Sequence, residues 1–126
     1  MAVYSILVVD DEPELRELML LILKTAGHTV VGAADGVEAA ARIANQHFDV
    51  VLTDLIMPEK DGLEFIAELR EKYPNVRIIA MSGGGHIPRD SYLRIAQGFG
   101  AHAILEKPFE NREIFAAIET ALAKSV

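Results

Sequence analysis

Residues 5–26 read SILVVDDEPELRELMLLILKTA and combine two patterns in one short stretch. The segment Ser5–Val9, apolar from Ile6 onward, has the length and the β-branched content of a buried strand. After a group of acids, apolar residues recur at helical spacing through Pro13–Ala26. This stretch therefore predicts one strand followed by one helix.

The same strand and helix patterns recur along the rest of the chain. Further strands are predicted at Thr29–Ala33, Val50–Thr53, Arg77–Met81 and Ala103–Leu105. Further helices are predicted at Val37–Gln46, Leu63–Lys72, Arg89–Phe99 and Arg112–Lys124. Regular alternation of this kind is typical of an α/β fold, in which helices cover both faces of a mainly parallel sheet. We therefore predict a doubly wound α/β domain.

The composition indicates one small acidic domain. The 126 residues include 12 Lys plus Arg and 19 Asp plus Glu, which gives a formal net charge of -7. Because binding to the phosphate backbone of nucleic acids depends on basic residues, we expect no direct nucleic-acid partner. The sequence has no cysteine, which excludes disulfides and thiol chemistry. The histidines lack the spacing of a metal site; they are His28, His47, His86 and His102.

Apolar runs in this chain are short. None near the start reaches the length of a signal segment or a membrane span, so we expect a cytoplasmic protein without membrane insertion. The chain ends soon after the last predicted helix. We therefore expect a single domain over residues 1–126, with no effector domain.

Three predicted helices begin with the same acidic signature. Asp11, Asp35 and Asp61 each stand at an expected N-cap, and each is followed three residues later by Glu. An N-cap Asp satisfies free N–H groups of the first turn and is worth about 1 kcal/mol. Capping therefore explains these residues without a functional role, whereas it does not explain Asp10 and Asp54.

Polar residues follow the carboxyl ends of the predicted strands. In open parallel sheets, ligands bind at this edge, where the strand order reverses. If the order is 2-1-3-4-5, the first and third strands are neighbours, and Asp10, Asp11 and Asp54 meet. Carboxylates this close need a counter-charge, and Mg²⁺ is suitable because it accepts both carboxylate and phosphate oxygens. With Ser82 and Lys107 nearby, these are the parts of a phosphoryl-transfer site whose nucleophile is a carboxylate.

Four segments carry a recognisable order and spacing: ILVVDDEPELR (residues 6–16), VVLTDLIMPEKDGLEFI (50–66), IIAMSGG (78–84) and AILEKPF (103–109). Together they resemble the receiver domain of two-component response regulators. The resemblance covers nearly the whole chain and implies a flavodoxin-like (βα)5 sandwich with strand order 2-1-3-4-5. It also implies a regulatory phosphoprotein, not an enzyme, that accepts a phosphoryl group and loses it slowly by autodephosphorylation.

The resemblance implies a role for each candidate site residue. Asp54 would be the phosphoacceptor, Ser82 the switch hydroxyl and Lys107 the residue that binds the phosphoryl oxygens. The Lys107–Pro108 peptide bond would be cis. Mg²⁺ would be held by Asp10, Asp11, Asp54 and the backbone carbonyl of Ile56.

The implied partners are a histidine kinase or a histidine phosphotransfer protein, and a downstream protein whose affinity changes on phosphorylation. A phosphorylation-dependent dimer is also compatible with the resemblance. One position departs from the family pattern, because Ile104 stands where receivers usually carry Tyr or Phe. Isoleucine has no ring to swing between exposed and buried states. Output would therefore rely more on the glycine-rich loop Gly83–Gly85 and on the helix Arg89–Phe99.

Two other functions compete with this interpretation. A phosphatase of the haloacid dehalogenase type also uses Asp, Ser, Lys and Mg²⁺, but it needs a second acid two residues after its nucleophile. The segment Asp54-Leu55-Ile56 lacks that acid, and Asp10 and Asp11 are adjacent instead of spaced. A docking module that is never phosphorylated is the other alternative. The presence of every residue that the chemistry needs argues against it.

The first predicted helix offers a candidate partner surface. At 100° per residue, one apolar stripe should face the sheet, with Leu23 at its border: Leu15, Leu18, Met19, Ile22 and Ala26. Leu20 and Leu21 fall outside this stripe, so we predict that both are exposed. They are either ordinary surface scatter or an anchor for a kinase helix bundle, with a polar rim of Arg16, Glu17 and Lys24.

Overall fold

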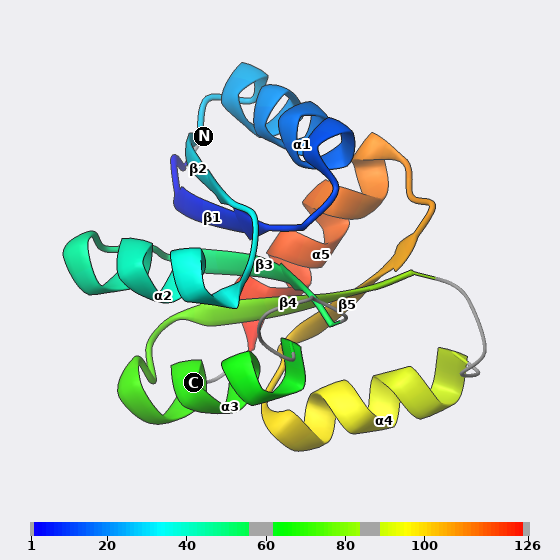
Figure 1. The fold of residues 1–126 in the computed structure, drawn as a ribbon. Coiled ribbons are helices and arrows are strands. Elements are labelled where there is room, and N and C mark those ends of the chain that lie inside the picture. Colours follow the sequence, from blue (N-terminus) through cyan, green and yellow to red (C-terminus); the bar gives the residue numbers. More distant parts are fainter. Residues whose placement is uncertain (1, 56–61, 84–88, 125–126) are drawn as a thin grey trace.

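The computed structural model describes residues 2–55, 62–83 and 89–124. Over these residues, strands and helices alternate as the sequence predicts (Figure 1). The strands are β1 (Ser5–Val9), β2 (Thr29–Ala33), β3 (Val50–Asp54), β4 (Arg77–Gly83) and β5 (Ala103–Lys107). The helices are α1 (Pro13–Thr25), α2 (Gly36–Asn45), α3 (Gly62–Lys72), α4 (Arg89–Phe99) and α5 (Asn111–Ala123).

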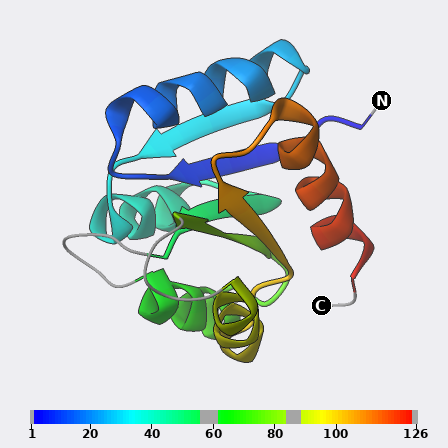
Figure 2. The same ribbon diagram turned by 90° about the vertical axis from the view of Figure 1, so that its right-hand side faces the viewer.

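The strands form a parallel sheet in the order β2-β1-β3-β4-β5, which confirms the predicted topology. Helices α1 and α5 cover one face of the sheet, and α2, α3 and α4 cover the other (Figures 1 and 2). Because β1 and β3 are central, helices cover both of their faces. This explains why Ile6–Val9 and Val50–Leu52 are apolar without interruption.

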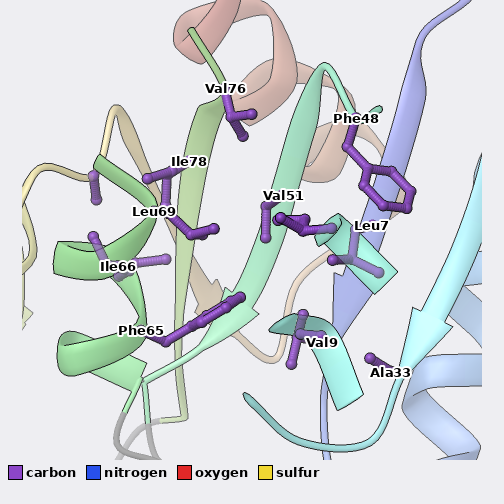
Figure 3. Packing of buried hydrophobic residues seen from close by; sticks show 14 of the residues in the cluster. Leu7, Val9, Ala33, Phe48, Val51, Phe65, Ile66, Leu69, Val76 and Ile78 are labelled. Atoms are coloured by element: carbon purple, nitrogen blue, oxygen red, sulfur yellow. The ribbon is translucent and has the colours of Figure 1, made fainter. Parts of the chain in front are cut away.

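Two apolar clusters lie on the two faces of the sheet. On the α2–α4 side, Phe65, Ile66 and Leu69 of α3 point toward Val51 and Ile78 of the sheet (Figure 3). On the opposite side, buried residues of α1 and α5 pack against alternate residues of the same strands. These clusters hold the strand ends at fixed positions, and the candidate site residues stand on those ends.

Three strands are longer than predicted. β3 includes Asp54, β4 runs through Ser82 to Gly83, and β5 runs to Lys107. The polar side chains suggested loops, but ladder pairing uses backbone groups and continues regardless of side chain. Ser82 pairs with Glu106, and Gly83 pairs with Lys107. These residues are therefore held by the sheet itself.

The predicted cap at Asp11 is wrong. The N-cap of α1 is Glu12, which has extended backbone and makes no side-chain capping bond. Pro13 explains the difference, because the residue before a proline is disfavoured in the helical region and cannot start the helix. The N–H of Glu12 donates instead to Asp10 Oδ1 at 2.9 Å. Asp11 is therefore not used as a cap.

The other two predicted caps have different outcomes. Asp35 is the N-cap of α2, where its Oδ1 accepts the Glu38 N–H at 2.8 Å, which confirms the prediction. Asp61 lies outside the described residues.

Helix α1 is rotated relative to the predicted stripe. Met19 and Leu23 are fully buried, whereas Leu18 is 52% exposed. Leu20 packs against the core, so its predicted exposure is wrong, while Leu21 is 63% exposed as predicted. The cause lies on β2, where Gly32 has no side chain and leaves room for Leu20. The exposed pair on α1 is therefore Leu18 and Leu21.

No helix in the described part of the chain combines the length and the apolar character needed to cross a membrane.

Candidate functional site

Three carboxylates meet at the carboxyl edge of the sheet, as the strand order predicts. Asp10 and Asp11 follow β1, and Asp54 ends the neighbouring strand β3. One carboxylate oxygen from each lies within 4.8 Å of the others. Asp10 is fully buried and Asp54 is 6% exposed, whereas Asp11 is exposed to solvent. The cluster therefore has a buried floor and an open side.

Lys107 brings a positive charge from β5 into this cluster. Its Nζ lies 2.8 Å from Asp10 Oδ2 and 3.0 Å from Asp54 Oδ2. Burial of the ammonium on its own lowers the pKa of Lys107, but its contacts with Asp10 and Asp54 outweigh burial and raise the pKa above its ordinary value. Lys107 therefore stays charged at neutral pH and offsets part of the negative charge.

Glu12 is a further carboxylate that the sequence analysis did not assign to the site. Its Oε1 lies 3.5 Å from Lys107 Nζ, and its side chain is 65% exposed. Its position directly after Asp10 and Asp11 was the available signal, but that position was interpreted as part of a helix start. Glu12 adds negative charge at the open side of the cluster.

The Asp54 backbone is held by a close approach to α3. The N–H of Gly62 donates to the Leu55 carbonyl at 3.0 Å. A Cβ built on Gly62 would overlap the carbonyl oxygen of Asp54 and the Cα of Leu55. Only glycine allows this contact, so Gly62 fixes the end of β3 that carries Asp54.

The remaining predicted site residues are placed as follows. Ser82 is 4% exposed and directly follows Met81, the ladder partner of Asp54. The Lys107–Pro108 bond is cis, which confirms that expectation. Ile104 is partly buried and packs against the apolar cluster on the α2–α4 side. Ile56 lies outside the described residues, so its carbonyl is not placed.

The oxygen donors fit a hard divalent cation. Carboxylates of Asp10, Asp11 and Asp54 are the ligand type that Mg²⁺ takes, with remaining positions open to water or phosphate oxygens. Asp10 Oδ2 is buried and, apart from its ion pair with Lys107, accepts no well-aligned hydrogen bond from a described residue. A buried carboxylate oxygen in this state has spare capacity for a cation.

Comparison with known proteins agrees with this geometry. A family model described as the response regulator receiver domain matches residues 6–119. The transcriptional regulatory protein GlrR of Escherichia coli (strain K12) is 34% identical over 120 residues. The match covers 95% of this chain but only 26% of GlrR, so the chain spans about a quarter of that relative.

Solved structures give the same result over whole chains. The chemotaxis protein CheY4 of Vibrio cholerae has 30% sequence identity and a TM-score of 0.85, and the match covers 95% of this chain and 99% of CheY4. The response regulator protein TrrA of Thermotoga maritima has 29% identity and a TM-score of 0.80, and the match covers 93% of this chain and 97% of TrrA. The chain belongs to the family of response regulator receiver domains of two-component systems.

Proposed function

We propose that this receiver domain takes a phosphoryl group from phosphohistidine onto Asp54 in a Mg²⁺-dependent reaction. One observation carries the proposal: a buried carboxylate, Asp54, lies at the floor of an acidic cluster and 3.0 Å from the charged Lys107. A Ser or Cys nucleophile would need a neighbouring base, whereas a carboxylate is already ionised. Residues 1–126 would act together as one such domain.

In the proposed transfer, an oxygen of Asp54 attacks the phosphorus of the donor. A P–O bond forms while the P–N bond to the donor imidazole breaks, and the bonding electrons leave with the imidazole, which takes up a proton from solvent. Bound Mg²⁺ would neutralise charge on the phosphoryl oxygens. Asp10 and Asp11 would hold the ion together with Asp54, and the Ile56 carbonyl is the further ligand that we assign.

Lys107 and Ser82 act on the phosphoryl group after transfer. Lys107 Nζ is already within 3.0 Å of Asp54 Oδ2, so a phosphoryl oxygen on Asp54 lies within its reach. The Ser82 residue follows the ladder partner of Asp54 on β4. Movement of this hydroxyl toward the phosphoryl group would link Asp54 to α4, which follows β4 in the chain. The structure of TrrA in complex with Mg²⁺ and BeF supports a metal-dependent site of this type in a similar protein.

Intact-mass analysis tests the proposal. We expect incubation with a small phosphodonor and Mg²⁺ to add one phosphoryl group to the wild type and none to Asp54→Asn. Asp35→Asn is the matched control, because Asp35 caps α2 away from the cluster. Normal labelling of Asp54→Asn would contradict the assignment of Asp54 as the phosphoacceptor. Multiple turnover of the donor would favour a phosphatase, and no labelling of the wild type would favour a docking module.

The partner surface lies beside this site. A groove of about 630 Å³ runs between α1 and the start of α5, and its lining includes Leu18, Lys107 and Phe109. Leu18 and Leu21 stand one helical turn apart on α1 and are both exposed. A helix pair of a kinase or phosphotransfer protein that covers them would bring its phosphohistidine toward Asp54. We assign this surface to the phosphodonor, in place of the pair Leu20 and Leu21.

A further inference from the structure

Arg16, on the second turn of α1, reaches back to the acidic cluster. Its Nη1 donates to the backbone carbonyl oxygen of Asp10 at 2.8 Å. The sequence analysis placed Arg16 on the rim of a partner surface, but the side chain is half-buried and directed at the end of β1. This contact needs an explanation that neither the helix pattern nor the proposed partner surface supplies.

The carbonyl that Arg16 holds belongs to the peptide unit between Asp10 and Asp11. The orientation of this peptide unit sets the directions in which both side chains leave the backbone. The same residue is fixed on its other side, because the Asp10 N–H donates to the Ala33 carbonyl at 3.1 Å. Arg16 therefore completes the clamp on a peptide that carries two of the three clustered carboxylates.

Gly32 on β2 leaves room for the Arg16 side chain. A Cβ built on Gly32 would lie 3.2 Å from Arg16 Cδ and 3.4 Å from Arg16 Cγ. The aliphatic part of Arg16 thus crosses the sheet surface over the missing side chain, and its guanidinium ends at Asp10. A stem packed in this way loses little further freedom when its hydrogen bond forms.

Charge alone does not account for the position of Arg16. Among the described residues, Arg16 makes no ion pair within 4.0 Å. A guanidinium near a cation site also repels the cation, so an electrostatic effect on Mg²⁺ binding would be unfavourable. A favourable effect of Arg16 on Mg²⁺ affinity must therefore come from geometry. Removal of Arg16 would tighten Mg²⁺ binding if its charge dominates, and would weaken Mg²⁺ binding if its positioning of Asp10 dominates.

We propose that Arg16 is a positioning residue that orients Asp10 and Asp11 for a divalent cation, with Gly32 as the platform for its stem. This inference rests on the proposed Mg²⁺ site. Groups that orient metal ligands typically change metal affinity about tenfold or more when they are removed. The Arg16–Asp10 contact therefore raises the affinity of the cluster for Mg²⁺.

Titration calorimetry with Mg²⁺ alone tests the inference. We expect the Kd to rise about tenfold in Arg16→Met, which keeps most of the stem and removes the donor. Arg16→Lys should recover part of the affinity, since it keeps a donor for the Asp10 carbonyl although it also keeps the repulsive charge. Gly32→Ala should also weaken binding, because its Cβ crowds the Arg16 stem as well as Leu20 while every polar group remains. Arg42→Met is the matched control, because Arg42 is an exposed arginine on α2.

The outcomes separate the inference from the proposed function. A wild type that binds Mg²⁺, with equal or tighter binding by Arg16→Met, overturns the role of Arg16 alone. A folded wild type that binds no Mg²⁺ overturns the proposed metal site together with this inference. If Arg16→Met does not fold in a circular dichroism melt, Gly32→Ala decides the question by the same measurement.

A kinetic readout distinguishes positioning from general destabilisation. With a small phosphodonor, the labelling rate of Arg16→Met should approach that of the wild type as Mg²⁺ becomes saturating. The substitution then changes the Mg²⁺ requirement and leaves the maximal rate nearly unchanged. A fall in the maximal rate at unchanged Mg²⁺ requirement contradicts the inference.

Discussion

His102 shows how one buried side chain links stability to pH. The residue is 6% exposed, and its Nδ1 accepts the Ile78 N–H at 3.0 Å. Burial, together with the nearby charges of Arg70, Arg77 and Lys124, lowers the pKa of His102 from 6.5 to about 4. Protonation of Nδ1 would also break the bond from Ile78, because a protonated nitrogen cannot accept.

This depressed pKa predicts a loss of stability in mild acid. Between pH 6.5 and about 4, the unfolded chain binds a proton at His102 that the folded protein does not bind. The free energy of unfolding should therefore fall through this range as pH decreases, by up to about 3 kcal/mol from this residue. His102→Asn keeps an acceptor oxygen but does not titrate. Urea unfolding at several pH values should show a shallower decline in the variant, and an equally steep decline would contradict the prediction.

The close approach at Gly62 leads to a second prediction, which concerns a substitution of this glycine. Gly62→Ala places a Cβ against the backbone of Asp54 and Leu55, which cannot move aside as a flexible side chain would. We expect it to lower the free energy of unfolding by about 2 kcal/mol or more and to weaken Mg²⁺ binding.

Gly98→Ala is the matched control for this substitution. Gly98 is a glycine of α4 with no atom within 4 Å of its built Cβ. Alanine there should be neutral or stabilising by about 0.5–1 kcal/mol. Equal unfolding curves for Gly62→Ala and the wild type would contradict this prediction, because they would show that α3 moves away from β3 without loss of stability.

The places of most helices and strands along the chain could be predicted from the sequence, because local patterns determine them. The strand Ser5–Val9 and the Asp35 cap could be predicted without knowledge of other elements. The start of α1 was also predictable, since Pro13 alone excludes Asp11 as the cap. The rotation of α1 was not predictable in this way. It depends on Gly32 of another strand, and a helical pattern carries no information about the surface that it meets.

The corrected surface of α1 gives a prediction for partner recognition. Leu18→Glu together with Leu21→Glu places two charges on a face that a phosphodonor helix would cover, so phosphotransfer from the cognate kinase should slow at least about tenfold. Labelling by a small phosphodonor should stay unchanged, since neither leucine contacts the carboxylates.

Val37→Glu is the control for the leucine variant. Val37 is 62% exposed and lies on α2, on the other face of the sheet. Stopped-flow or autoradiographic transfer assays give the rates. Unchanged transfer from the kinase to the double variant would make Leu18 and Leu21 ordinary exposed residues.

For the molecule as a whole, the acidic cluster concentrates negative charge at a site that only the folded protein contains. Folding brings Asp10, Asp11 and Asp54 together and supplies Lys107 as partial compensation. A cation that binds only the folded protein stabilises it, by about 2.7 kcal/mol at one hundred times its Kd. We expect Mg²⁺ to raise the Tm of the wild type.

The same titration on variants identifies where the cation acts. Asp11→Asn should need a higher Mg²⁺ concentration for the same rise in Tm, whereas Asp35→Asn should behave like the wild type. A rise in Tm that is identical in Asp11→Asn would place the stabilising cation elsewhere on the protein.

The candidate site was predictable as a set of residues but not as a network of contacts. Parallel topology places the ends of β1, β3 and β5 at the same edge of the sheet, and the long Lys107 side chain reaches Asp54 past the intervening strand β4. The distances among the groups depend on side-chain directions that the sequence does not specify. For this reason, the sequence did not predict two contacts of the site. Glu12 contacts Lys107, and Arg16 contacts the backbone of Asp10.

The order of the strands has a consequence for a chain that folds while it is synthesised. In the described part of the sheet, no ladder joins residues closer in sequence than Ser5 and Thr29, so each pairing waits for a complete crossover. Once Asp54 has emerged from the ribosome, β3 can pair with β1 and gather the carboxylates. Lys107 is added only when the fifth strand is made. Until then, Lys107 cannot offset the repulsion among the three carboxylates, so we expect cations of the surrounding solution to offset it during elongation.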